Sequence, residues 1–283
     1  MKRSAKIFLS AALILAFSFT HIPLASAAKR YAKKKSRTPF LTAKAVAIVD
    51  STKGTVLYSK NPHLRLPPAS TTKLMTALIA LEHLPLGRKV TVSPYAASMA
   101  PSKAGLTIHA TYRVSELIVA TLVSSSNDAA VALAQAAAGS EEKFVRLMNA
   151  KAKALGMSNT YFANATGLPA KDRKQFSTAY DLTRLIRYAM KDKRIDYVMG
   201  ITMASFRGSD GKRIVIKSHN KMLWRTPKFV KGKTGWTYAS RHTFVGTNYA
   251  PHKKIYFAML SSKKPWLDIE RLATFGLFLK SRN

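Results

Sequence analysis

The chain has 283 residues and carries 47 lysines and arginines against 13 aspartates and glutamates, with no cysteine. The absence of thiols excludes disulfides, cysteine catalysis and cysteine-ligated zinc. A formal net charge of +34 favours anionic polymers and surfaces as surroundings, although charge alone indicates no particular chemistry.

The first 27 residues have the pattern of a cleaved signal peptide. Lys2, Arg3 and Lys6 form a positive start, residues 7–17 are apolar, and residues 25–27 (Ala-Ser-Ala) offer a small-residue cleavage site. An uncleaved anchor is the alternative, but the apolar run is shorter than the ~20 residues that cross a bilayer. We therefore expect export to the periplasm or cell-wall space, with the protein soluble or peripherally attached and nucleic acid not a partner.

Residues 28–40 contain many lysines and arginines and little to bury. This composition is typical of a disordered tether. We expect the tether to make electrostatic contact with anionic envelope surfaces.

Ordered structure is predicted to begin near Leu41. Two β-rich runs, 44–50 and 55–59, flank Gly54 and indicate a hairpin. After Pro67-Pro68 the segment 71–84 is apolar on nearly every side, which predicts a buried helix. Helical patterns then follow at 114–138, with a break at 124–128, and at 141–155 and 180–190.

The chain returns to β-like runs at 213–217, 231–237, 242–247 and 254–260, and closes with a helix at about 267–280. Strands at both ends with helices between them predict an α/β fold, in which an antiparallel sheet is flanked by helices and the first hairpin pairs with the last strands. We expect one domain at 41–283, with a mostly helical subdomain inserted at roughly 86–200. The apolar residues of the last helix should pack on the sheet; they are Leu267, Ile269, Leu272, Phe275, Leu277 and Phe278.

Ser70 and Lys73 stand at the start of the predicted buried helix. Residues three apart share a helix face, so the hydroxyl and the amine can meet. Burial lowers the pKa of a lysine, which makes it a usable base near neutral pH. The same Ser-x-x-Lys spacing recurs elsewhere in this lysine-rich chain, and a simple helix cap is the alternative reading of Ser70.

Two further motifs accompany this pair. Ser125-Ser126-Asn127 lies at the break between two helical stretches, where side chains can project into a cleft. Lys233-Thr234-Gly235 lies in a β-like run, where a strand edge offers an ammonium, a hydroxyl and backbone N–H groups. Each motif taken alone is also compatible with an ordinary cap or turn.

In this order, the three motifs resemble the set found in penicillin-binding proteins and class A β-lactamases. Longer blocks resemble the D-alanyl-D-alanine carboxypeptidase family of low-molecular-mass penicillin-binding proteins, over roughly residues 43–260. These blocks are PPASTTKLMTALIALE, LVSSSNDAAVALA, FANATGL, STAYDL and HNKMLWR. The resemblance implies a β-lactamase/transpeptidase-like fold, peptidoglycan stem peptides as substrates, β-lactams as covalent inhibitors, and no metal or cofactor.

The resemblance also implies roles for the motif residues. Ser70 would attack the carbonyl between two D-alanines, Lys73 would take its proton, and Ser125 would relay a proton to the leaving amine. Asn127 would hold the substrate amide and Lys73. Lys233 and the Thr234 hydroxyl would bind the terminal carboxylate of the substrate, with Gly235 permitting its close approach. The backbone N–H groups of Ser70 and Trp236 would form the oxyanion hole.

Two related activities remain open. A D,D-endopeptidase that cleaves peptidoglycan cross-links uses the same machinery, and the sequence does not separate it from a carboxypeptidase. A class A β-lactamase needs a glutamate between the second and third motifs, and this chain has none between Lys143 and Ile269. We therefore expect a long-lived penicilloyl adduct. A non-enzymatic envelope-binding protein would explain only the charge.

Overall fold

A computed structural model describes residues 38–170, 174–225 and 230–280. The predicted signal peptide, and the predicted tether as far as residue 37, lie outside the described residues. The chain divides into two compact units, Met1–Thr38 and Pro39–Asn283, and every element named below belongs to the second.

A five-stranded sheet forms the centre of this unit, with the strand order β2-β1-β9-β8-β7 and antiparallel pairing throughout. Val46 on the first strand pairs with Met259 on the last, so the first hairpin adds to the final strands as predicted. The strands are β1 (Ala45–Asp50), β2 (Val56–Lys60), β7 (Lys231–Thr237), β8 (Arg241–Ala250) and β9 (Lys253–Ser262).

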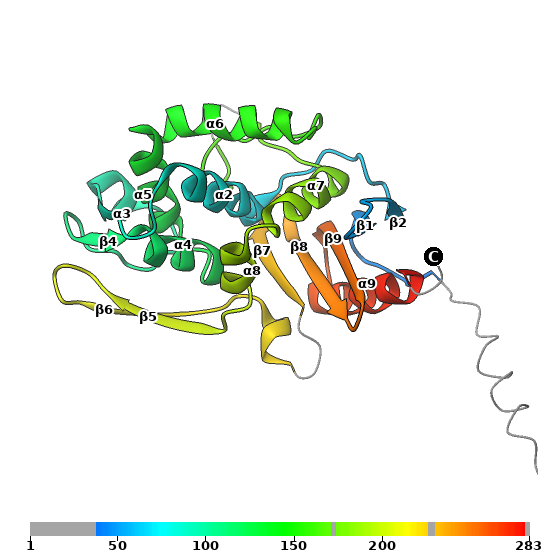
Figure 1. The fold of residues 1–283 in the computed structure, drawn as a ribbon. Helices are drawn as coiled ribbons and strands as arrows, with labels where there is room; N and C mark the ends of the chain where they lie inside the picture. The colour runs from blue at the N-terminus through cyan, green and yellow to red at the C-terminus, as the bar shows by residue number, and fades with distance from the viewer. Residues whose placement is uncertain (1–37, 171–173, 226–229, 281–283) are drawn as a thin grey trace, which may run out of the picture. The chain divides into compact units, whose positions relative to one another are not determined.

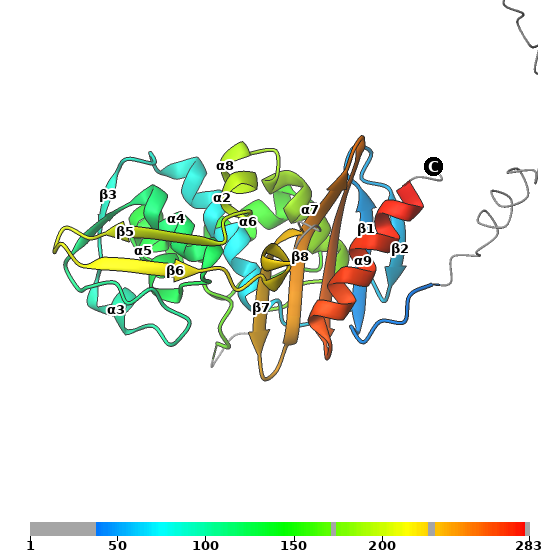
Figure 2. The same ribbon diagram turned by 90° about the horizontal axis from the view of Figure 1, so that it is seen from below.

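The two faces of the sheet are covered by different helices (Figures 1 and 2). On β1, Ala45, Ala47 and Val49 belong to the large core shared with α2 (Lys73–His83) and α7 (Ala179–Ala189). Val46 and Ile48 alternate with them and belong to a smaller core under α9 (Pro265–Lys280). Because both faces are covered, β1 is buried almost throughout, which explains its unbroken apolar sequence.

The last helix packs on the sheet, as predicted for most of its apolar residues. Ile269 and Leu272 are fully buried, and the Phe275 ring lies 5.4 Å from the Tyr58 ring, edge to face. Leu267 and Phe278 are 38% and 39% exposed, and neither is among the residues that pack against the smaller core. Across the described residues, no helix is both long enough and apolar enough to span a bilayer.

The predicted helices lie beside α2, and short elements connect them. The helices are α4 (Val114–Val123), α5 (Asn127–Ala138) and α6 (Glu141–Ala154), with α7 following. The sequence did not reveal the short elements α3 (Pro94–Ser98), α8 (Lys193–Val198), η2 (Lys221–Trp224), β3 (Lys89–Thr91), β4 (Thr111–Arg113) and β5 (Met203–Arg207). The partner of β5 is the predicted strand β6 (Arg213–Lys217), and this hairpin contacts α4.

Helix α2 is the central helix of the unit. It contacts α4, α5, α6 and α7, and every residue from Lys73 to Leu81 is buried. A single 3-10 turn, η1 (Ala69–Thr72), precedes it and contacts β7. The amino-terminal end of the most buried helix therefore meets the edge strand of the sheet, and this junction holds the candidate site.

Candidate active site

Ser70 and Lys73 meet at the junction of η1 and α2. Nζ of Lys73 lies 3.0 Å from Oγ of Ser70, and it donates a second hydrogen bond of 2.7 Å to the carbonyl oxygen of Thr166. Lys73 is fully buried, whereas Ser70 is partly exposed. The hydroxyl thus faces solvent while the amine that contacts it does not.

The surroundings of Lys73 favour its neutral form. Burial holds the pKa of Lys73 well below its ordinary value, and the nearby positive charge of Lys233 lowers it further. The carboxylate of Asp128 acts in the opposite direction and is the smallest of the three influences. A lysine in this state can accept a proton from Ser70 near neutral pH.

Ser125 lies between α4 and α5 with a left-handed backbone (φ +60°), a conformation that non-glycine residues seldom adopt. Nζ of Lys233 on β7 donates a 2.9 Å hydrogen bond to Ser125 Oγ and another of 2.7 Å to the carbonyl of Thr234. Burial lowers the pKa of Lys233 to about 7. The second and third motifs are thus joined directly, through a lysine that is only 1% exposed.

Asn127 does not make the contact with Lys73 that the resemblance implies. Its side-chain amide donates to the carbonyl of Ala100 at 2.8 Å, and its backbone N–H donates to Ser102 at 2.7 Å. Within the described residues it makes no hydrogen bond to Lys73, and its buried Oδ1 has no partner. The carbonyl of Thr166 provides the second acceptor for Lys73 instead.

Asp128 supports this arrangement and was not identified from the sequence. Its buried carboxylate accepts hydrogen bonds from the backbone N–H groups of Ala104, Gly105 and Leu106, at 2.9–3.1 Å. It therefore ties the segment that supplies Pro101 and Ser102 to the start of α5. The sequence feature that could have identified Asp128 is its position: it is a carboxylate in the first turn of a predicted helix, directly after the second motif.

The block FANATGL, which contains Thr166 and Gly167, contacts the turn that carries Ser70, a role that the sequence did not reveal. A Cβ on Gly167 would lie 1.9 Å from the carbonyl oxygen of Ala69, and a Cβ on Gly235 would lie 2.8 Å from the backbone nitrogen of Ser70. Both positions therefore require glycine, because two segments approach the same turn of backbone from different sides.

These side chains surround a cleft of about 370 Å³. Lys73 and Lys233 are buried and do not line this cleft. Trp236 lines it and is 50% exposed, with its ring 4.9 Å from the Tyr238 ring. Among the predicted site residues, those lining the cleft are Ser70, Ser125, Asn127, Thr234, Gly235 and Trp236. In the part of the chain that the structure describes, no group of three or more histidines or carboxylates could hold a metal ion.

The sequence profile of the D-alanyl-D-alanine carboxypeptidases (peptidase family S11) matches residues 32–263, which include every residue of this cleft predicted from the sequence. The chain belongs to this family. The predicted family membership and the predicted α/β fold are both confirmed.

Individual members of the carboxypeptidase family share about a third of the sequence. D-alanyl-D-alanine carboxypeptidase DacF of Bacillus subtilis is 36% identical over 82% of this chain, which spans only 60% of that relative's length. A D-alanyl-D-alanine endopeptidase of Escherichia coli is 32% identical over 94% of this chain and 86% of its own. An evolved penicillin-binding protein homolog from Mycobacterium tuberculosis has a similar structure, with a TM-score of 0.81 and 30% identity over 86% of this chain and 94% of its own.

Proposed function

We propose that this protein is a serine D-alanyl-D-alanine carboxypeptidase that removes the terminal D-alanine from peptidoglycan stem peptides in cell-wall remodelling. The observation that carries the proposal is the fully buried amine of Lys73, 3.0 Å from a partly exposed Ser70 hydroxyl. Membership of the carboxypeptidase family supports it.

In the first step Lys73 takes the proton of Ser70, and Oγ attacks the carbonyl carbon between the two D-alanines. The backbone N–H groups of Ser70 and Trp236 stabilise the oxyanion; a donor of this kind contributes about 10²–10³ in kcat. Ser125 then relays this proton from Lys73 to the leaving nitrogen, the C–N bond breaks, and D-alanine departs. In the second step Lys73 takes a proton from water as the water oxygen attacks the acyl carbon; the ester C–O bond breaks, and the proton passes to Oγ, which restores the Ser70 hydroxyl.

The remaining motif residues bind substrate. Lys233 in its protonated form and the Thr234 hydroxyl hold the terminal carboxylate. Oδ1 of Asn127 is buried without a partner and is adjacent to the cleft. A substrate amide N–H would satisfy this acceptor and remove the cost of leaving it unpaired.

The direct test of the proposal is mass spectrometry after exposure to penicillin, followed by peptide mapping. Among the described residues that line the cleft none is a carboxylate, so the glutamate that a class A β-lactamase uses to release a penicilloyl group has no counterpart there. We expect a stable adduct on the peptide containing Ser70 and none in Ser70→Ala. Attachment at Ser140 or Ser218 would place the nucleophile elsewhere.

The endopeptidase activity is the second candidate, because the Escherichia coli endopeptidase matches this chain along most of both lengths. Incubation with a pentapeptide ending in D-alanyl-D-alanine and with a cross-linked peptide dimer separates the two activities. Release of D-alanine with the dimer left intact is the expected result, whereas preferential cleavage of the dimer would establish an endopeptidase.

We further propose that the protein acts outside the cytoplasm, after removal of residues 1–27, with the basic segment 28–40 attracting it to anionic envelope surfaces. The signal-like and lysine-rich sequences support this proposal. Amino-terminal sequencing of the mature protein is expected to begin near Ala28. Moderate salt should release the protein from cell envelopes, because it screens surface charges; release that is independent of salt would remove this role.

A further inference from the structure

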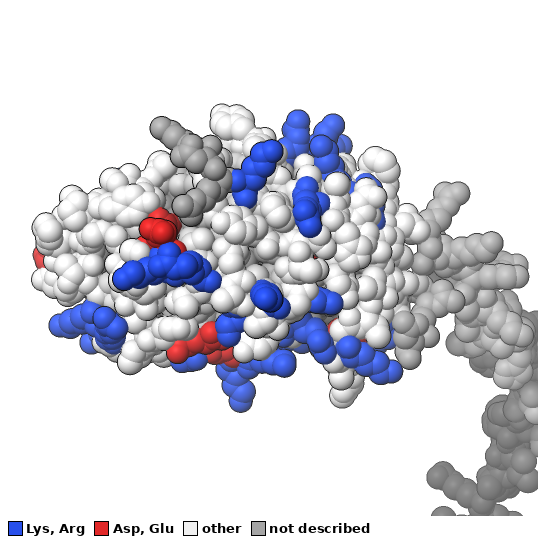
Figure 3. Space-filling view, turned by 90° about the horizontal axis from the view of Figure 1, so that it is seen from above, with Lys and Arg blue, Asp and Glu red and all other residues white. Residues whose placement is uncertain are grey.

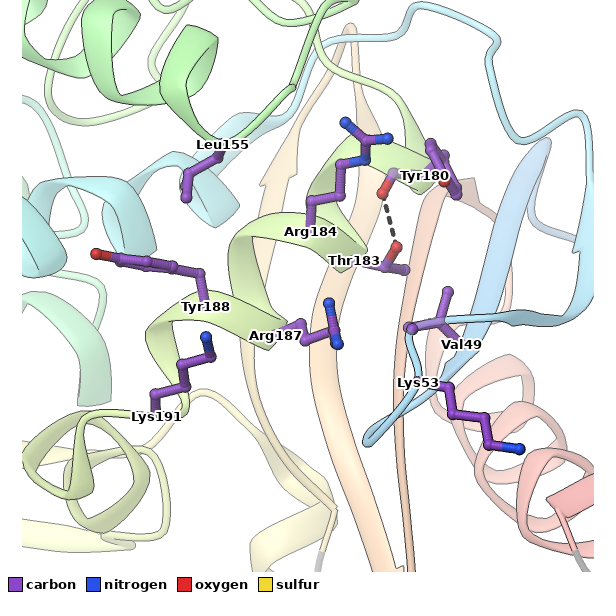
Figure 4. Close-up of a pocket in the computed structure, with 10 residues that line it drawn as sticks. Val49, Lys53, Leu155, Tyr180, Thr183, Arg184, Arg187, Tyr188 and Lys191 are labelled. Carbon is purple, nitrogen blue, oxygen red and sulfur yellow. Dashed lines mark hydrogen bonds between the residues drawn. The ribbon is translucent and has the colours of Figure 1, made fainter.

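A second hollow lies between α7, the turn joining β1 to β2, and the carboxyl-terminal end of α6 (Figure 4). Its volume is about 290 Å³, and none of the residues lining it also lines the Ser70 cleft. Four of its lining residues are cationic, namely Lys53, Arg184, Arg187 and Lys191, and none is acidic. On the face of the molecule seen in Figure 3, lysine and arginine side chains predominate over acidic ones.

The two arginines of this hollow are held by neutral groups. Arg187 donates to the carbonyl oxygens of Ser51 and Thr52, at 3.4 and 2.8 Å. Arg184 donates to the carbonyl of Gly156, and its guanidinium lies 4.9 Å from the centre of the Tyr180 ring. Such contacts fix the position of a guanidinium but leave its charge uncompensated.

The ammonium groups of the two lysines also lack a salt bridge within the described residues, although the backbone N–H of Lys53 donates to the Asp50 carboxylate at 2.8 Å. Nζ of Lys191 lies 5.7 Å from the centre of the Tyr188 ring, and neither Lys191 nor Lys53 forms a salt bridge with a carboxylate of the described residues. Lysines elsewhere differ: Lys231 pairs with Asp196 at 3.0 Å and Lys280 with Asp50 at 2.9 Å. The hollow therefore collects four positive charges that the described part of the chain does not neutralise.

The arginines keep free donors in fixed positions. Each guanidinium has five N–H groups, and one or two of them are used by the contacts above. Gly54 makes room for Arg187, since a Cβ there would lie 2.9 Å from its Cζ. Because these donors are already positioned, an anion that binds them loses little side-chain freedom in doing so.

We propose that this hollow binds the phosphate group of a soluble or wall-linked phosphodiester polymer. Arg184 and Arg187 project from α7, Lys191 follows the carboxyl-terminal end of this helix, and Lys53 lies on the turn between β1 and β2 (Figure 4). The forked N–H donors of the two guanidinium groups match the oxygens of a phosphate, and the two lysines add point charges to the same hollow. This inference is independent of the D-alanine chemistry at Ser70.

A lipid surface fits the hollow less well. The two aliphatic side chains that line it are recessed: Val49 is 2% exposed and Leu155 is half-buried. Proteins that rest on a bilayer insert protruding apolar side chains next to their cationic ones. No aliphatic side chain of the lining protrudes, and the exposed ring of Tyr188 already lies beside the ammonium groups of Lys151 and Lys191. These features favour a polymer in solution over a lipid headgroup.

The test measures binding of a fluorescent poly(glycerol phosphate) oligomer by anisotropy, at constant ionic strength. The double variant Lys53→Gln/Lys191→Gln removes two charges from the hollow. The control Lys89→Gln/Lys217→Gln removes two charges from exposed positions on β3 and β6. We expect binding about fivefold weaker or more for the first variant and little change for the control, given the strength of exposed charge pairs. Equal weakening in both would show only diffuse attraction and would overturn the site.

Four further measurements test the ligand class. Inorganic phosphate should displace the oligomer, and Arg184→Lys, which keeps the charge but loses the planar fork, should weaken binding. A polyglutamate of equal charge that binds as tightly would overturn the preference for phosphate. Vesicles of phosphatidylglycerol that bind the protein through this hollow while the oligomer does not would replace the polymer with a lipid. Penicillin labelling of Ser70 at wild-type rate in every variant would show that the fold and the catalytic site are intact.

Discussion

Two lysines beside Ser70 are almost completely buried and contact only neutral oxygens. Lys73 and Lys233 are 0% and 1% exposed, and their hydrogen-bond partners are hydroxyls and carbonyls. A buried cation without a carboxylate partner destabilises the folded state. The same burial lowers the pKa of Lys73 and so favours the neutral amine that can act as a base. Burial of these lysines therefore increases the reactivity of the site and decreases the stability of the fold.

This cost predicts a dependence of stability on pH. The pKa of Lys233 is about 7 in the folded protein, against 10.5 for an ordinary lysine. Between these values the unfolded chain binds more protons, so the free energy of unfolding should rise as pH increases from about 7 towards 10.5, by at most ~1.4 kcal/mol per pH unit for this group. Urea denaturation at several pH values measures the slope.

The variant Lys233→Met should flatten this slope and increase stability at pH 7, because it removes the buried charge. Lys231→Met is the matched control: it lies two residues away on β7, but that lysine is partly exposed and paired with Asp196. An identical slope in wild type and Lys233→Met would show that Lys233 does not cause the dependence of stability on pH.

Replacing Lys73 by methionine should slow acylation of Ser70 by penicillin about 10²–10⁴-fold, the usual contribution of a positioned base. The side chains are similar in length and methionine removes a fully buried amine, so thermal stability should not fall. Lys60→Met provides the control, since Lys60 also donates to backbone carbonyls, of Leu41 and Ala43, but lies outside the cleft. Unchanged acylation in Lys73→Met would mean that another group acts as the base.

At the scale of elements, the site depends on the close approach of β7 to the turn that carries Ser70. Gly235 permits this approach, since a Cβ there would lie 2.4 Å from Thr243 Oγ1 and 2.8 Å from the Ser70 nitrogen. Thr243 itself donates to the carbonyl of Pro68 at 3.0 Å, so β8 holds the same turn.

Gly235→Ala should therefore displace β7 from Ser70 and reduce the rate of acylation about 10²-fold, the effect of a misplacement of roughly 1 Å. Stopped-flow measurement with a chromogenic β-lactam gives the rate. Gly87→Ala is the control, because a Cβ at Gly87 meets nothing within 4 Å. If both variants acylate at the wild-type rate, the close approach is not needed for chemistry.

At the scale of the molecule, the sheet depends on joining the two ends of the domain. The buried carboxylate of Asp268 on α9 accepts hydrogen bonds from the backbone N–H groups of Thr42 and Ala43, and from the hydroxyls of Thr42 and Ser262, at 2.6–3.0 Å. Residues 42 and 43 lead directly into β1. One side chain thus links the entry to the sheet with the helix that closes it.

Asp268→Ala should lower the free energy of unfolding by about 3 kcal/mol or more, because several buried donors lose their acceptor at once. Acylation of the protein that remains folded should be unaffected, since Asp268 does not line the cleft. Glu142→Ala removes an exposed carboxylate paired with Arg146 and should change stability by less than about 0.5 kcal/mol. Equal losses in the two variants, measured by urea denaturation, would contradict the role of Asp268.

The longer elements were predictable because their patterns are local. Strands β6 and β7 occupy the residues predicted for them, and α2 follows the predicted apolar run. The short strands β3 and β4 and the short helix α3 carry too few residues to establish a period, and only their neighbours stabilise them. Strand β5 is as long as β6, but its sequence MASFR has no β-branched residue where RIVIK has three, so only its pairing with β6 identifies it.

The contact between Ser70 and Lys73 follows from helical spacing: the two residues are three positions apart, and this separation was enough to predict their contact. The other contacts join distant segments: Lys233 reaches Ser125 across 108 residues, and Lys73 reaches the Thr166 carbonyl across 93. The expected bond between Asn127 and Lys73 is absent from the described residues because packing brings Thr166 to the amine and Ala100 to the Asn127 amide. Local spacing determines which side chains share a helix face, whereas the packing of remote segments determines which acceptor a buried amine finds.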